Sequence, residues 1–119
     1  MFKKVLCILS LCILCFCGSV LAERNIATVN TYSSSQLIKG SGGFIYSISF
    51  VATSNGGNFI IYDETTLASI AGDNTSIKAE GSEVSSLGSL YQDFSNKPLR
   101  FTTGIYLSIT NGYVVLHYE

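Results

Sequence analysis

Hydrophobic and polar residues alternate along most of the chain beyond residue 25, with the period of β-strands rather than of helices. The strongest alternation covers residues 44–51, where one face is strongly apolar and the other is mixed. A turn-forming cluster, Ser-Asn-Gly-Gly, follows at 54–57, and aromatic and β-branched residues resume at 58–62. The pattern predicts two strands joined as an antiparallel hairpin. The apolar face of its first strand is expected to carry Phe44, Tyr46, Ile48 and Phe50.

A second hairpin is predicted at the end of the chain. Ile105, Leu107 and Ile109 share one strand face, and residues 113–118 supply a strand that returns to the last residue. Between them stands Asn-Gly at 111–112, the dipeptide that most favours a type I′ turn. We therefore expect these two strands to pair along their edges.

The remaining strands are less clearly marked. Residues 26–32 alternate weakly and are expected to form an edge strand, followed by breaks at 33–35 and 40–43. Pro98 cannot donate a ladder hydrogen bond, so it is placed at the start of a strand containing Leu99, Phe101 and Thr103. Short strands are predicted at 67–71 and 76–79 around a turn at 72–74, and residues 83–91 form either a strand or a serine-rich crossing.

Seven or eight short strands with turns about every ten residues predict an all-β fold, an antiparallel β-sandwich or a jelly-roll-like arrangement. The sequence shows no internal repeat and no convincing amphipathic helix after residue 22. Residues 23–119 have the length of one domain.

The first 22 residues have the organisation of a signal peptide, expected as a helix preceding the domain. Lys3 and Lys4 form its positive region, residues 5–16 its apolar region, and Val-Leu-Ala at 20–22 its cleavage site, so cleavage before Glu23 is predicted. A retained anchor is the alternative, although the apolar stretch is short for a membrane span. Lipidation at Cys17 is another, and it is disfavoured by the bulky residue that precedes this cysteine. We expect a secreted protein, or one located in the periplasm or at the cell surface.

Removal of this segment changes the chemistry of the chain. All four cysteines, Cys7, Cys12, Cys15 and Cys17, are removed with it. Disulfides, cysteine metal sites and thiol catalysis are therefore not expected in the remaining chain. Five basic and eight acidic residues remain, a net charge of −3. The basic residues are scattered along the sequence, so no nucleic-acid partner is expected: Arg24, Lys39, Lys78, Lys97 and Arg100.

No catalytic, cofactor or metal site is predicted. His117 is the only histidine and is expected on the same strand face as Tyr113 and Val115, without an indicated nucleophile or orienting partner. The Gly-x-Ser-x-Gly pattern of serine hydrolases is absent. Asp63 and Glu64 could ligate calcium if they met Asp73 and Asn74, but turn-forming carboxylates are the preferred interpretation. The glycosylation triplet at 74–76 is treated as a chance match.

Tyrosines are the remaining chemical feature, seven in a chain without tryptophan. Tyrosine combines apolar area with a polar hydroxyl, which suits half-exposed sheet faces and interfaces. Tyr106 and Tyr113 are expected to flank each other across the closing hairpin, on its outward face. This pair could form a contact surface for a sugar or a second subunit, but ordinary cross-strand packing is the preferred interpretation.

Three segments are similar to parts of a known group of proteins. The sequences at 43–50, 58–63 and 99–105, among them Ile-Tyr-Asp and Arg-Phe-Thr-Thr-Gly, resemble small β-sandwich structural or decoration proteins encoded among the virion genes of tailed phages. The resemblance covers residues 40–119. It implies a structural role in a virion, with no catalytic residues.

Two functions are consistent with the sequence. The first is an exported, non-enzymatic structural or assembly module that acts through surface contacts or self-association. The alternative is a secreted module that binds carbohydrate or another surface ligand. Expected partners are therefore further copies of the chain or other surface or virion proteins, and contact with a membrane is expected only through the signal peptide before cleavage.

Overall fold

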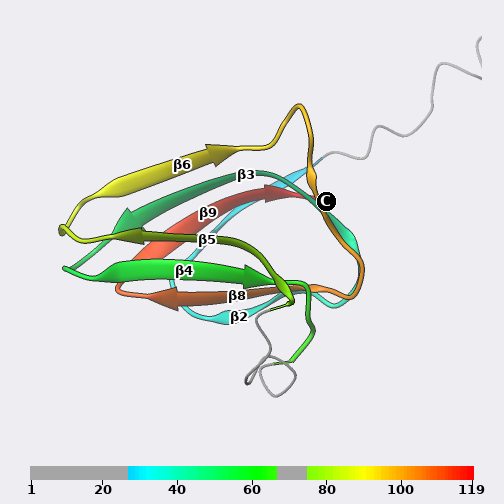
Figure 1. The fold of residues 1–119 in the computed structure, drawn as a ribbon, viewed down its shortest axis with the longest axis horizontal. Helices are drawn as coiled ribbons and strands as arrows, with labels where there is room; N and C mark the ends of the chain where they lie inside the picture. Colours follow the sequence, from blue (N-terminus) through cyan, green and yellow to red (C-terminus); the bar gives the residue numbers. More distant parts are fainter. Residues whose placement is uncertain (1–26, 67–74) are drawn as a thin grey trace, which may run out of the picture.

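The chain forms two antiparallel β-sheets packed face to face (Figure 1). The computed structural model describes residues 27–66 and 75–119, which contain nine strands and no helix. Sheet A runs in the order β1-β9-β3-β6, with β7 also paired to β3; its strands are β1 (Thr28–Tyr32), β3 (Gly43–Ala52), β6 (Ser89–Asp93), β7 (Leu99–Phe101) and β9 (Gly112–Tyr118). Sheet B runs in the order β2-β8-β4-β5; its strands are β2 (Gln36–Lys39), β4 (Gly57–Tyr62), β5 (Ile77–Glu83) and β8 (Ile105–Thr110). In this part of the chain there is no helix of the length and apolarity that a membrane crossing requires.

Both predicted hairpins are wrong in their pairing, although all four strands are present. β3 lies in sheet A and β4 in sheet B, and β8 and β9 are likewise divided between the sheets. Each pair is joined by an arch that turns one apolar face onto the other, so the strands pack across the core instead of sharing ladder hydrogen bonds. In the second arch Asn111 has a positive φ of 51° while Gly112 does not, so the expected type I′ turn is not formed.

An irregularity in β3 also changes the predicted apolar face. The register with β9 shifts between Ile45 and Ser47, so Tyr46 and Ser47 both lie on the outward side. Ile48 and Phe50 are buried as predicted, but Ile45 takes the inward position that was assigned to Tyr46. A single extra residue inverts the alternation, because side chains change face at every residue.

Several other strand predictions are confirmed. β1 is an edge strand of sheet A, and Pro98 immediately precedes β7. β7 ends at Phe101, so Thr103, which was assigned to the same strand, lies in the connection that follows. The serine-rich segment proves to be a turn at 84–88 followed by β6. β2 was not predicted, because four residues between two turn clusters are too short to show alternation. The expected strand at 67–71 and the signal peptide lie outside the described residues.

The core lies between the sheets and receives side chains from both. Phe50 of sheet A meets Phe59 of sheet B with ring centroids 5.4 Å apart. Burial of such side chains contributes about 1.5–3 kcal/mol each. Among the residues that the structure describes, the buried apolar side chains of this core are Ile45, Ile48, Phe50, Ala52, Phe59, Ile61, Ala79, Phe101, Ile105, Leu107, Val114 and Leu116.

Two polar contacts hold the N-terminal strands onto this core. The hydroxyls of Tyr32 and Tyr118 are 2.9 Å apart and connect β1 to the last strand. Burial, together with this hydrogen bond, raises the pKa of Tyr32 to about 12, so its hydroxyl stays protonated at neutral pH. In the β1–β2 connection, the Ser35 hydroxyl accepts a 2.9 Å hydrogen bond from the Ile109 N–H. This bond extends the pairing of sheet B to the residue that precedes β2.

The close approach of Gly112 to the core gives a test of this packing. A Cβ at position 112 would overlap the ring of Phe50, which is fully buried. We expect Gly112→Ala to reduce the free energy of unfolding by about 1–3 kcal/mol in urea denaturation, since a packed core resists added volume. Gly40→Ala is the matched control, because its Cβ would meet only a Leu37 methyl at 3.9 Å. Equal stabilities of the two variants would contradict the arrangement of the second arch.

Candidate functional site

The two tyrosines predicted to form one surface lie on different sheets. Tyr106 is on the outer face of sheet B, opposite Tyr62 and Leu37 in the strand register. Tyr113 is on the outer face of sheet A, opposite Val51. The expectation that Tyr106 and Tyr113 flank each other is wrong, because it depended on an edge-paired hairpin.

The structure instead gives Tyr106 a tyrosine neighbour that the sequence did not reveal. Leu37, Tyr106, Tyr62 and Ile77 follow one another in register across the four strands of sheet B. We call these four residues the tyrosine row. Tyr62 and Tyr106 alternate with buried neighbours, so both point outward and are partly exposed. Tyr62 was not identified because its partner strand, β8, is more than 40 residues away in the sequence.

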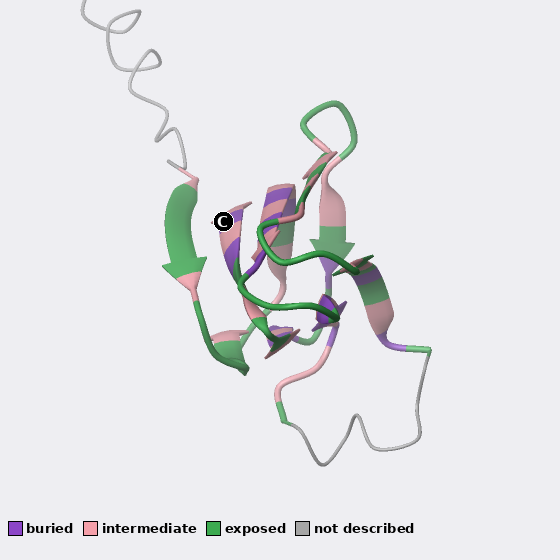
Figure 2. Cartoon of the chain, turned by 90° about the vertical axis from the view of Figure 1, so that its left-hand side faces the viewer, coloured by how far each residue is buried: buried purple, intermediate pink, exposed green. Residues whose placement is uncertain are grey.

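The outer edge of sheet A is a second surface feature. Among the described residues no strand pairs with the free side of β1, and Figure 2 shows this strand, which follows the grey N-terminal trace, as almost entirely exposed. β1 contains no charged residue, proline or glycine, and it pairs with β9 without irregularity. The other edge strands each carry a charged residue, and β2 and β5 also have irregular registers. Charges and bulges are the features that prevent edge-to-edge association, so β1 is the least protected edge.

His117 lies on the outer face of sheet A with Tyr113 and Val115, as predicted. Its ring is 5.4 Å from the ring of Tyr46, at an interplanar angle of 44°. The pKa of Tyr46 is raised above its ordinary value, mainly by burial and then by a hydrogen bond to the Glu119 side chain. The histidine therefore stacks beside a protonated phenol.

Asp63, considered above as a calcium ligand, is engaged by the backbone of the β7–β8 connection. Its carboxylate accepts hydrogen bonds from the N–H groups of Thr102, Thr103 and Gly104, at 2.7–3.3 Å, and from the Thr102 hydroxyl at 3.0 Å. The Lys78 ammonium lies 3.8 Å from Oδ2. Burial raises the pKa of Asp63, but the hydrogen bonds outweigh it, so its pKa is below the ordinary value.

This arrangement makes Asp63 a structural anchor. The N–H donors occupy the positions that a cation would need, and no group of three or more histidine, cysteine or acidic residues in the described ranges is placed to bind a metal. Asp73 and Asn74 lie outside those ranges.

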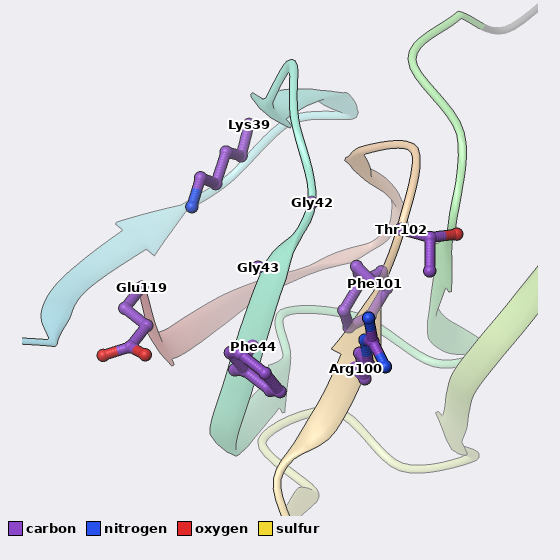
Figure 3. A pocket seen from close by; sticks show the side chains of 8 residues that line it. All are labelled: Lys39, Gly42, Gly43, Phe44, Arg100, Phe101, Thr102 and Glu119. Atoms are coloured by element: carbon purple, nitrogen blue, oxygen red, sulfur yellow. The ribbon is translucent and has the colours of Figure 1, made fainter.

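The basic residues are not scattered in the folded chain. Lys39 and Arg100 line a pocket of about 650 Å³ at one end of the sandwich, where Figure 3 shows Lys39 and Glu119 on one side, Arg100 on the other, and Phe44 between them. Lys78, Lys97 and Arg100 line a second pocket of about 590 Å³. Arg100 borders both, so every lysine and arginine of the described residues lies at this end. The sequence could not show this, because the cations come from three separate segments, at 39, 78 and 97–100.

The anchor predicts a specific loss of stability. Asp63→Ala leaves the N–H groups of Thr102, Thr103 and the buried Gly104 without their acceptor, so we expect the free energy of unfolding to fall by about 1–3 kcal/mol at neutral pH. Glu64→Ala, at the neighbouring carboxylate, is the control and should change it by less than about 0.5 kcal/mol. The stabilisation by ionised Asp63 is complete above its unfolded pKa of 3.8 and is lost as pH falls through its lower folded pKa. Urea melts from neutral pH to about pH 2 should therefore show the wild type converging on Asp63→Ala at acid pH; a constant difference would contradict the anchor.

Comparisons with protein-family models, with curated proteins and with solved structures found no match to this chain. Its function must therefore be inferred from the features described above, which are the tyrosine row, the unprotected sheet edge, the Asp63 anchor and the end of the sandwich that carries the cations (the cationic end).

Proposed function

We propose that the protein is an exported, non-enzymatic structural or assembly module, and that it self-associates by pairing β1 with β1 of a second copy. The observation that carries this proposal is the unprotected edge of β1. The strand offers a row of backbone donors and acceptors without a charge or proline to oppose pairing.

Pairing of two identical strands suits a two-fold contact. An antiparallel β1–β1 pair brings each residue opposite a residue of the same strand, so a charged edge would repel its copy, whereas this uncharged edge does not. Backbone hydrogen bonds across the pair would continue sheet A through both molecules. Val29, which is 61% exposed, would gain an apolar neighbour in the contact.

The fold is compatible with this role. The strand orders β1-β9-β3-β6 and β2-β8-β4-β5 match those of a jelly roll, an architecture that serves viral capsid and lectin domains. This is an analogy at the level of fold and supports either function. The proposed resemblance of residues 40–119 to phage virion proteins is consistent with assembly, and the predicted signal peptide would direct that assembly outside the cytoplasm.

A lysine on the edge should prevent this association. We expect Val29→Lys to remove the β1–β1 contact and so to lower the mass of the assemblies that the purified protein forms in light scattering over a concentration series, because the two-fold contact would bring the introduced charges together. Thr110→Lys is the control: the residue is exposed, but β8 lies between β2 and β4 and has no free edge. A wild-type protein that is monomeric at every concentration would refute the proposal.

The tyrosine row supports a second candidate, binding of carbohydrate. Tyr62 and Tyr106 lie directly opposite each other on one outer face, and neighbouring aromatic side chains with hydroxyl groups can stack on a sugar ring and hydrogen-bond to it. Leu37, 43% exposed, extends the apolar surface on one side.

This candidate predicts which tyrosines matter. Tyr62→Ala and Tyr106→Ala should each weaken binding of a glycan found on an array about tenfold, the equivalent of about 1.4 kcal/mol. Tyr113→Ala is the matched control on the opposite sheet and should leave binding unchanged. Absence of binding to any glycan on the array would set the candidate aside.

A further inference from the structure

The loop between β5 and β6 presents two aliphatic side chains to solvent. Val84 is 82% exposed and Leu87 is 80% exposed, the highest values among the large apolar residues that the structure describes. Together they form what we call the apolar tip. It lies at the end of the sandwich where the two arches also turn, opposite the cationic end (Figure 1).

The apolar tip is held in place by hydrogen bonds. The Leu87 N–H donates to the Ala52 carbonyl at 2.8 Å, and the Ala52 N–H donates to the Gly88 carbonyl at 2.9 Å. The Ser86 N–H donates to the Asn55 side chain at 2.9 Å. An ordered loop loses little conformational entropy when it binds, which favours association.

Leu87 also adopts an unfavourable conformation. Its φ is 65°, in the left-handed region that costs a non-glycine residue about 1–2 kcal/mol. Within the chain this strain yields no compensating burial, because the leucine side chain points into solvent. Backbone strain of this kind clusters at functional sites such as ligand clamps and switch regions.

The second pocket of the cationic end, which we call the cationic pocket, has matching properties. Phe94, Pro98 and Leu99 provide an apolar lining, and Phe94 and Leu99 also pack against the core. With a volume of about 590 Å³ the pocket has room for two aliphatic side chains.

Charge adds a second match. Glu83 directly precedes the apolar tip, whereas Lys97 and Arg100 border the pocket. Within the described ranges the one ion pair is Lys78 with Asp63, so Lys97 and Arg100 remain free to meet a carboxylate. The rim of the pocket carries Lys78, Lys97 and Arg100 against one carboxylate, Asp93, so it is basic overall. An apolar tip with an acidic neighbour therefore lies at one end of the molecule, and an apolar pocket with a net basic rim lies at the other.

We propose that the apolar tip of one copy inserts into the cationic pocket of the next, with Glu83 meeting Lys97 and Arg100. This rests on the proposed assembly function but uses surfaces separate from β1. Because the two surfaces differ and lie at opposite ends, the contact is head-to-tail and repeats into a row. The two-fold β1 contact would then join neighbouring rows side by side.

Two blocked variants test the contact in a Val29→Lys background, which removes the β1 pairing. The tip-blocked chain carries Val84→Ser and Leu87→Asn; asparagine tolerates the left-handed conformation, so the loop should keep its shape. The pocket-blocked chain carries Lys97→Glu and Arg100→Glu, which would repel Glu83. Both changes are at exposed side chains, and thermal melts should confirm that each variant folds.

Each blocked chain alone is expected to be monomeric in light scattering, because it lacks one half of the contact. Mixed in equal amounts they should form a 1:1 dimer and nothing larger, since one intact tip and one intact pocket remain. Addition of Glu83→Lys to the pocket-blocked chain should restore longer rows. A mixture that stays monomeric overturns the head-to-tail contact, and dimers in either variant alone would do the same. When Val29 is kept, the tip-blocked chain should still form the β1 dimer. That dimer would show that a failure of the head-to-tail contact is not a failure of the proposed function.

Discussion

Burial of two apolar sheet faces against each other is the interaction on which the rest of the structure depends. With Cys7, Cys12, Cys15 and Cys17 all in the first 22 residues, the domain has no disulfide to hold its layers together, and the contact of Phe50 with Phe59 stands at the centre of the core that does so. The two arches, β3 to β4 and β8 to β9, each carry the chain from one sheet to the other and so bring the two apolar faces together.

Asp63 has a corresponding role at one end of the sandwich. It binds three successive N–H groups in the connection from β7 in sheet A to β8 in sheet B, and so ties the end of β4 to that crossing. Arg100, which lines both pockets, is two residues before Thr102. The same contact therefore also orders the surroundings of Arg100. A polar anchor thus gives the cationic end a defined shape.

The sandwich has different chemistry at its two ends and on its edges. One end collects Lys39, Lys78, Lys97 and Arg100, and the other displays the exposed aliphatic side chains of the β5–β6 loop. Of the sheet edges, the one formed by β1 lacks charge. Unlike ends favour directional contacts and an uncharged edge favours a symmetric one, and these two features are the basis of the proposed assembly.

The sequence alone determined that the chain is built of strands, where most of them run and which turns separate them. Alternation and turn chemistry act between neighbouring residues, so β3, β4, β8 and β9 were all predictable. It did not determine which strands share an edge, because alternation marks the apolar face of a strand but says nothing of its neighbours. The bulge at Tyr46, the Tyr62–Tyr106 pair and the gathering of the cations follow from contacts between distant segments. Those contacts arise only when the two sheets close on a common core, and so the tertiary structure decided them.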